Sequence, residues 1–200
     1  MDIKALYKLY QQHPCITTDS RDCPQGSIFL ALKGESFDGN KFAVQALEKG
    51  CSYAIVDDAS VIPDGDDRLI LVENCLQTFK DLAREHRRQF DIPVIGITGT
   101  NGKTTTKELV AAVLSQKYKV LYTQGNFNND VGVPKTLFRL TKAHEIAVIE
   151  MTQKDIVRQY FQQNQLKKYE DPGWTNYFVQ QVYKGGTNTT GSESPEQYES

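Results

Sequence analysis

The chain has 200 residues, of which 39% are hydrophobic, so it is long enough for one or two domains with a sizeable core. Its 23 Lys and Arg residues nearly balance its 25 Asp and Glu residues, so no strongly basic face is expected and nucleic acid is excluded as the expected partner. No apolar segment approaches the roughly 20 residues that span a bilayer, and the first residues lack the pattern of a signal peptide.

The first 90 residues alternate helical and strand patterns, which is typical of an α/β unit with a mostly parallel sheet. Gly50 follows an amphipathic stretch and predicts the end of a helix. The basic run over 84–88 closes the last helix of this unit, and we interpret it as a solvated face that favours the helix dipole. The predicted helices are 2–12, 40–49 and 75–90, and the predicted strands are 27–32, 53–56 and 69–72.

A second unit, residues 91–151, opens with an apolar run that predicts a buried strand, followed by a Gly-rich loop and a helix. Gly99 and Gly102 accept backbone conformations denied to other residues, so successive N–H groups can point into one concavity. The start of the helix adds its partial positive charge there. The predicted strands are 92–97, 119–123 and 146–151, and the predicted helices are 103–116 and 134–140.

This strand–loop–helix pattern predicts a phosphate-binding loop. Lys103 would reach the terminal phosphates of a nucleotide, and the hydroxyl of Thr104 would ligate Mg²⁺. The alternative interpretation is an ordinary strand-to-helix turn with a solvated lysine. The common form of the motif has glycine at position 97, where this chain has Ile97.

Residues 152–200 differ in character from the rest of the chain. They contain eight Gln but only five Leu, Ile and Val, too few to bury a core of their own. We predict a polar tail with a helix over 156–168 and a disordered end. The four cysteines lack the spacing of metal ligands, and we interpret them as reduced.

Three ordered groups of motifs resemble those of the Mur ligases, ATP-dependent enzymes of peptidoglycan assembly. The Asn-rich segment and the N-terminal segments are similar to those of the member that joins D-alanyl-D-alanine to UDP-N-acetylmuramoyl-tripeptide. The resemblance covers about residues 16–151. Its motifs lie at 18–21, 26–34, 37–42, 99–105 and 123–134.

The resemblance implies a reaction and a set of site residues. ATP would phosphorylate the peptide carboxylate of the first substrate, and the amine of D-alanyl-D-alanine would attack the acyl phosphate, with ATP and Mg²⁺ as cofactors. The implied nucleotide site is Gly99, Thr100, Asn101, Gly102, Lys103, Thr104 and Thr105. The implied catalytic residues are Lys103, Asn128, Asn129 and Glu150, with Thr104 and Glu150 as Mg²⁺ ligands. The implied UDP-sugar site is Ser20, Arg21, Lys33, Asp38 and Asn40.

Several of these residues also have ordinary interpretations. Glu150 ends a predicted parallel strand, where a carboxylate lies beside the ligand crevice; without the resemblance it would be interpreted as an ordinary strand-end charge. Asn128 and Asn129 have amides suited to orienting a phosphate or carboxylate, and the same amides cap turns. Asn40 stands where the resemblance leads us to expect histidine.

We therefore expect an α/β fold in three parts: a small N-terminal substrate domain over 1–90, a truncated P-loop parallel-sheet domain over 91–151, and a poorly ordered tail over 152–200. The resemblance ends before the parts that hold adenine, a second Mg²⁺ and the dipeptide, so no ligase turnover is expected of this chain alone. We expect a cytoplasmic monomer that acts on small molecules, without a membrane partner. Two alternatives stay open: another ligase of the superfamily, such as folylpolyglutamate synthase, and a non-catalytic nucleotide-sugar or phosphate-binding module.

Overall fold

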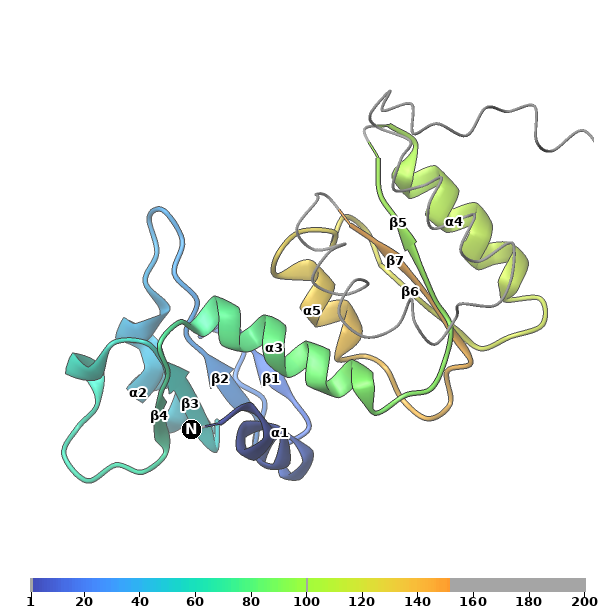
Figure 1. Cartoon of the computed structure of the whole chain (residues 1–200). Helices are drawn as coiled ribbons and strands as arrows, with labels where there is room; N and C mark the ends of the chain where they lie inside the picture. The colour runs from blue at the N-terminus through green and yellow to red at the C-terminus, as the bar shows by residue number, and fades with distance from the viewer. Residues whose placement is uncertain (1, 100, 152–200) are drawn as a thin grey trace, which may run out of the picture. The chain divides into compact units, whose positions relative to one another are not determined.

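The computed structural model describes residues 2–99 and 101–151. The chain divides between residues 91 and 92 into two compact units, and each unit has its own parallel sheet with helices packed against it (Figure 1). The α/β class and the parallel sheets are therefore confirmed. The predictions made for 152–200 lie outside the described residues.

The sheet of unit 1 has four parallel strands in the order in which they occur along the chain. Helix α1 packs against α3, and α2 packs against β2 and β3. Because the strands are parallel, the segments that follow them meet at one edge of the sheet. The strands are β1 (Ile16–Thr17), β2 (Ile28–Leu30), β3 (Tyr53–Val56) and β4 (Leu69–Leu71); the helices are α1 (Ile3–Gln12), α2 (Ala43–Glu48) and α3 (Cys75–Arg88), with 3-10 turns η1 (Gly39–Phe42) and η2 (Ala59–Val61).

Local signals in the sequence set the ends of these helices. The side chain of Asp2 accepts a hydrogen bond from the N–H of Lys4 at the start of α1 (2.6 Å), and that of Asn74 accepts one from Gln77 at the start of α3 (2.8 Å). Gly50, with a φ of +122°, follows α2 as predicted. The core of the unit contains Phe29, Leu30, Ile55, Phe79 and Leu82, each at most 1% exposed.

The interpretation of the basic run as a solvated face is wrong for two of its members. His86 and Arg87 are each only 7% exposed. The Nδ1 atom of His86 lies 3.0 Å from the hydroxyl of Tyr7, and its ring meets that of Tyr10 edge-on at 5.3 Å. Arg87 donates to the carbonyl of Phe90. The run is buried here because α1 covers this side of α3, a tertiary contact that the charge pattern does not reveal.

The sheet of unit 2 has three parallel strands in the order β5-β7-β6, with α4 and α5 on opposite sides of it (Figure 1). Its core consists of Ile95, Ile97, Ile146 and Val148, against which Val110 and Leu114 of α4 pack. The elements are β5 (Val94–Ile97), α4 (Lys103–Leu114), β6 (Val120–Tyr122), α5 (Gly132–Leu137) and β7 (Ile146–Glu150).

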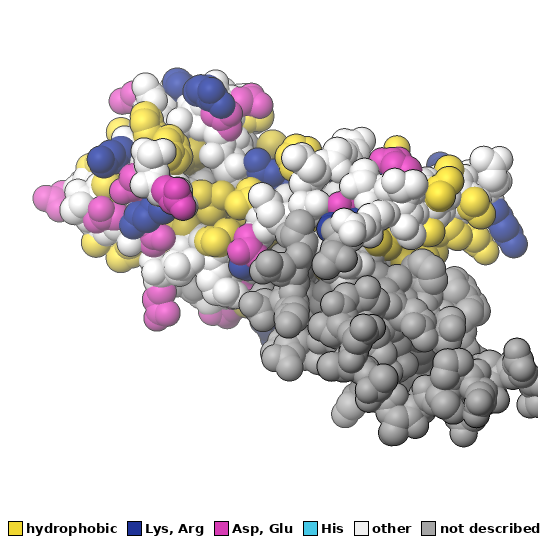
Figure 2. All heavy atoms as spheres, turned by 90° about the horizontal axis from the view of Figure 1, so that it is seen from above, with side chains coloured by type: hydrophobic (Ala, Val, Ile, Leu, Met, Phe, Trp, Pro, Cys, Tyr) yellow, Lys and Arg dark blue, Asp and Glu magenta, His cyan; other side chains and the backbone are white. Residues whose placement is uncertain are grey.

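The surface carries both signs of charge. Figure 2 shows Lys and Arg side chains interspersed with Asp and Glu side chains on the face that it presents, in keeping with the nearly balanced composition. Within the described part of the chain, no helix has the length and apolar character needed to cross a membrane.

Candidate functional site

The phosphate loop, residues 98–102, joins the end of β5 to the start of α4. Gly102 takes the position before the helix with a φ of +73°, a conformation that favours glycine. No side chain caps α4, and its first turn contains no acidic residue. The loop therefore brings a helix start with uncapped N–H groups and no opposing carboxylate, which suits a bound anion. Thr100 lies outside the described residues.

Lys103 reaches back across this loop. Its Nζ donates a hydrogen bond to the carbonyl oxygen of Gly99 at 2.7 Å. Asn101, Thr104 and Thr105 are exposed around the helix start. The lysine predicted from the pattern thus lies beside the loop amides, where an ammonium can contact phosphate oxygens.

Glu150 ends β7 beside the phosphate loop, and its side chain is only 1% exposed. Its Oε1 accepts hydrogen bonds from the hydroxyl of Thr104 at 3.2 Å and from the amide of Asn128 at 2.8 Å. The structure thus brings together three predicted site residues from three separate segments.

The other oxygen of this carboxylate, Oε2, is buried and accepts no hydrogen bond. A buried acceptor without a donor costs free energy, so it suits a ligand that supplies positive charge. No group of three His, Cys, Asp or Glu side chains able to hold a metal occurs in residues 2–99 and 101–151. Mg²⁺ that is bound together with phosphates and water nevertheless typically has few protein ligands, such as one carboxylate and one hydroxyl. Glu150 and Thr104 therefore fit the ion that the sequence predicts.

Two residues of this site were missed by sequence reasoning. Lys107 lies one helical turn after Lys103 and is fully buried, with its Nζ 3.7 Å from Oε2 of Glu150. Thr123 follows β6, is also fully buried, and accepts a hydrogen bond from the N–H of Glu150 at 2.9 Å. The four-residue spacing of the two lysines was the available signal for Lys107, because it places both on one side of α4.

Asn129 has a different place from Asn128. Its Oδ1 accepts hydrogen bonds from the N–H groups of Val131 and Gly132 at 3.2 and 2.8 Å. These contacts form a turn directly before α5, which begins at Gly132, two residues before the predicted start, and they agree with the turn-capping interpretation of this residue. A catalytic role for Asn129 stays a prediction.

In unit 1 the predicted residues Lys33, Asp38 and Asn40 meet around Asp57, which sequence reasoning missed; we call these four residues the aspartate cluster. Oδ1 of Asp57 accepts from the ammonium of Lys33 and from the amide of Asn40, both at 2.9 Å. Asn40, 1% exposed, also donates to Asp38 at 2.8 Å. Asp57 directly follows β3, so a polar residue at the carboxyl end of a parallel strand was the signal for it.

The charges of the aspartate cluster stabilise one another. Burial alone would raise the pKa of Asp57, but hydrogen bonds from the ammonium of Lys33, the N–H of Cys75 and the amide of Asn40 outweigh it and hold this pKa below its ordinary value. Hydrogen bonds from the side chain and N–H of Asn40 likewise lower the pKa of Asp38. Both carboxylates are therefore ionised at neutral pH and hold Asn40 in place.

We predict that Asp57→Asn flattens the acid branch of the stability profile. A carboxylate whose folded pKa is lowered stabilises the fold above its unfolded pKa, about 3.9 for Asp, and loses that contribution as pH falls through the folded pKa. Urea unfolding between about pH 5 and pH 2 should show the wild type losing more unfolding free energy than Asp57→Asn. Asp64→Asn, at an exposed position, is the control, and its profile should follow the wild type. Parallel profiles for the wild type and Asp57→Asn would contradict the prediction.

Ser20 and Arg21 lie in the segment after β1, whose pairing with β2 places them at the same edge of the sheet as the aspartate cluster. The guanidinium of Arg21 pairs with Asp19 at 2.7 Å, and its side chain is 87% exposed. The carbonyl of Ser20 accepts a hydrogen bond from Lys49 at 2.7 Å. Arg21 is therefore accessible to an anion, and its ion pair with Asp19 lies within its own loop rather than with the cluster.

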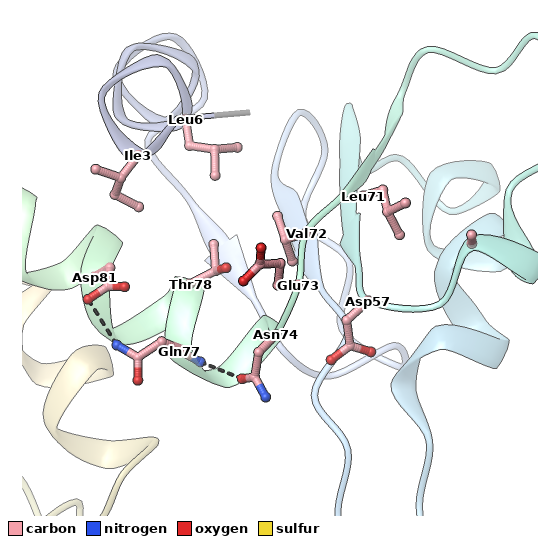
Figure 3. Close-up of a pocket in the computed structure, with 11 residues that line it drawn as sticks. Ile3, Leu6, Asp57, Leu71, Val72, Glu73, Asn74, Gln77, Thr78 and Asp81 are labelled. Carbon is pink, nitrogen blue, oxygen red and sulfur yellow. Dashed lines mark hydrogen bonds between the residues drawn. The ribbon is translucent and has the colours of Figure 1, made fainter.

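A cavity of about 680 Å³ opens in unit 1 between α1, the end of β4 and the first turns of α3. Figure 3 shows Asp57 and Glu73 among its lining residues, with Gln77 linking Asn74 to Asp81. Three carboxylates and no Lys or Arg line it. Such a lining repels a diphosphate, so we do not assign the sugar nucleotide to this cavity.

Comparison with known families gives two matches. The model of the Mur ligase family, catalytic domain, matches residues 14–100, and that of the Mur ligase middle domain matches residues 97–168. The second match continues beyond residue 151, where the motifs recognised in the sequence end.

Two curated proteins similar to this chain are named UDP-N-acetylmuramoyl-tripeptide–D-alanyl-D-alanine ligase. That of Synechocystis is 49% identical over 140 residues, which are 70% of this chain and 31% of the relative. That of Bacillus subtilis is 42% identical over 136 residues, 68% of this chain and 30% of the relative. The chain thus spans about a third of the length of these relatives.

Solved structures agree in fold. MurF from Acinetobacter baumannii is 37% identical with a TM-score of 0.65, and the match covers 73% of this chain and 35% of that one. The MurF ligase from Thermotoga maritima, solved in complex with ADP, is 36% identical with a TM-score of 0.64 and shares 70% of this chain and 32% of its own.

Proposed function

The chain belongs to the Mur ligase family, and from this premise we propose that it carries the phosphate-binding and UDP-sugar-binding parts of a ligase that joins D-alanyl-D-alanine to UDP-N-acetylmuramoyl-tripeptide. The relatives that bear this activity in their names match this chain over both of its units. We assign the described residues of this chain to two tasks of such an enzyme, which are holding a nucleotide's phosphates and holding a sugar nucleotide.

The observation that carries the proposal is the meeting of the phosphate loop with Glu150. Lys103 lies across the loop, and Thr104 at the helix start is hydrogen-bonded to the carboxylate. An uncapped helix start, an ammonium, and a hydroxyl beside a buried carboxylate are the groups that a nucleotide polyphosphate with Mg²⁺ requires.

In the proposed reaction, ATP would supply the phosphoryl group that activates the peptide carboxylate, and a bound Mg²⁺ would offset the charge on the phosphate oxygens. The residues of this chain act by positioning and by charge, since phosphoryl transfer needs little else from a protein. The loop amides and Lys103 hold the phosphates. Thr104 and Glu150 would hold the metal ion, and Asn128 fixes the orientation of the carboxylate through its hydrogen bond.

Unit 1 is proposed to hold the uridine diphosphate sugar at the carboxyl edge of its sheet. Lys33 is 47% exposed although its ammonium is paired with Asp57, so it can also contact a phosphate. Arg21 is the second cation at this edge. Asp38, which is partly exposed, can contact the ligand, whereas Asn40 is buried and acts by holding Asp38 and Asp57 in place. The proposal includes a cytoplasmic monomer that acts on small molecules.

Two separate titrations test the proposal. By isothermal titration calorimetry, we expect the chain to bind ADP in the presence of Mg²⁺ and, independently, UDP-N-acetylmuramoyl-tripeptide. Binding of neither ligand would contradict the proposal. Binding of the sugar nucleotide without ADP would favour the alternative, a nucleotide-sugar-binding module without ligase chemistry.

A further inference from the structure

Lys107 is a fully buried lysine that the proposed reaction does not use. Lysine is almost never fully buried unless its charge is paired, because removing an ammonium from water costs several kcal/mol. It is the fifth residue of α4, one helical turn beyond the phosphate loop. Its burial next to a carboxylate therefore indicates an electrostatic role in this site.

The ammonium of Lys107 connects three segments of unit 2. It donates to the carbonyl of Gly125 at 3.3 Å, in the segment that follows β6. It lies 2.9 Å from the carboxylate of Glu108, its neighbour on α4, which is 53% exposed. It also faces Glu150 at the end of β7. Because the side chain of Lys107 is 0% exposed, its charge lies inside the site.

The two oxygens of Glu150 have different surroundings. Oε1 is held by Thr104 and Asn128, whereas Oε2 is 3.7 Å from Nζ of Lys107, too far for a hydrogen bond. The ammonium thus attracts Oε2 without occupying its lone pairs. The ammonium, which also pairs with Glu108, offsets part of the charge of Glu150 and leaves the lone pairs of Oε2 unused for a divalent cation.

We propose that Lys107 is a positioning residue that acts as the resident counter-ion of Glu150. It keeps the carboxylate oriented for a divalent cation. When no cation is bound, it reduces the repulsion between the carboxylate and an incoming polyphosphate. Lys107 itself does not touch the nucleotide. This inference rests on the proposed function, because it requires a nucleotide polyphosphate beside Glu150.

The test is the affinity for ADP measured twice, with Mg²⁺ and with EDTA, for the wild type and Lys107→Met. Without the ammonium, Glu150 repels metal-free ADP, so this affinity should fall on the order of tenfold in EDTA. With Mg²⁺ the ion offsets the same charge, and the loss should be much smaller. Lys107→Arg keeps the charge and should resemble the wild type in both conditions.

If Lys107 had a purely structural role, Lys107→Met would lose equal affinity for ADP with Mg²⁺ and with EDTA, and this result would overturn the proposal. An affinity for ADP that is unchanged in both conditions would overturn it as well. A double variant, Lys107→Met with Glu150→Gln, removes both charges and should recover metal-free ADP affinity toward that of the wild type; failure to recover would also overturn it. If Lys107→Met does not fold, Lys107→Gln, which can still donate to Gly125, is measured in its place. A wild type that binds no ADP at all would instead refute the proposed function.

Discussion

Lys103→Ala should weaken the binding of Mg²⁺–ADP by roughly 10- to 100-fold, since a hydrogen bond to a charged group contributes about 1.5–3 kcal/mol. The ammonium of Lys103 already lies at the phosphate loop through its hydrogen bond to Gly99, so it needs little rearrangement to meet a phosphate. Lys103 is partly exposed and lies at the first position of α4, so its loss should leave the fold intact. The measurement is the dissociation constant of Mg²⁺–ADP by calorimetry.

The matched control is Lys117→Ala. Lys117 lies beyond the opposite end of α4, where its ammonium faces the ring of Tyr118. Both variants remove one positive charge from unit 2, so a general electrostatic effect would weaken binding in both. Equal dissociation constants for the two variants would contradict a specific role for Lys103.

Gly39→Ala should destabilise unit 1 and weaken binding of the sugar nucleotide. A Cβ at this position would lie 2.7 Å from the carbonyl oxygen of Leu32 and 2.9 Å from backbone atoms of Ala31. Gly39 also donates a hydrogen bond to that oxygen at 2.9 Å, so the two backbones cannot separate without breaking it. Overpacking of this kind costs about 1–3 kcal/mol, and thermal unfolding should show a midpoint lower by several degrees for a domain of this size, at roughly 4–8 °C for each kcal/mol.

Gly34→Ala, in the same loop, provides the control. No atom lies within 4 Å of a Cβ at Gly34, and its backbone does not have a positive φ. We expect its midpoint to stay close to that of the wild type, within the ±0.5 kcal/mol or so that is usual for surface changes. A Gly39→Ala midpoint equal to that of Gly34→Ala would show that the close approach does not constrain this loop.

Most of the fold was predictable because strands alternate with helices along both units. The apolar runs that end at Ile97 and Glu150 formed parallel strands, and the helix after the phosphate loop formed where its Lys-Thr start predicted. Strand β1 was not predicted, because two residues are too short to give a periodic signal. The predicted solvent exposure of the basic residues at the end of α3 was wrong in part, because His86 packs against α1. Residues far apart in the sequence make this contact.

The candidate site was predictable where a residue belongs to a recognised motif or directly follows a parallel strand. The family resemblance led to Glu150, and the position of this carboxylate at the end of a parallel strand agreed with it; the same position at the end of β3 would have pointed to Asp57. Neither signal applied to Lys107, because a lysine within a helix ordinarily faces water and only the packing of α4 over β7 encloses it. The predicted roles of Asn129 and of the UDP-sugar residues stay predictions.

The central claim is that main-chain amides of residues 99–105 surround the polyphosphate of a nucleotide. The direct measurement is a titration of the isotope-labelled chain with Mg²⁺–ADP, followed by the shifts of its backbone amide resonances. We expect the largest shifts at residues 99–105, with further shifts at Asn128 and Glu150. Shifts confined to unit 1, or saturating binding that leaves residues 99–105 unperturbed, would contradict the account.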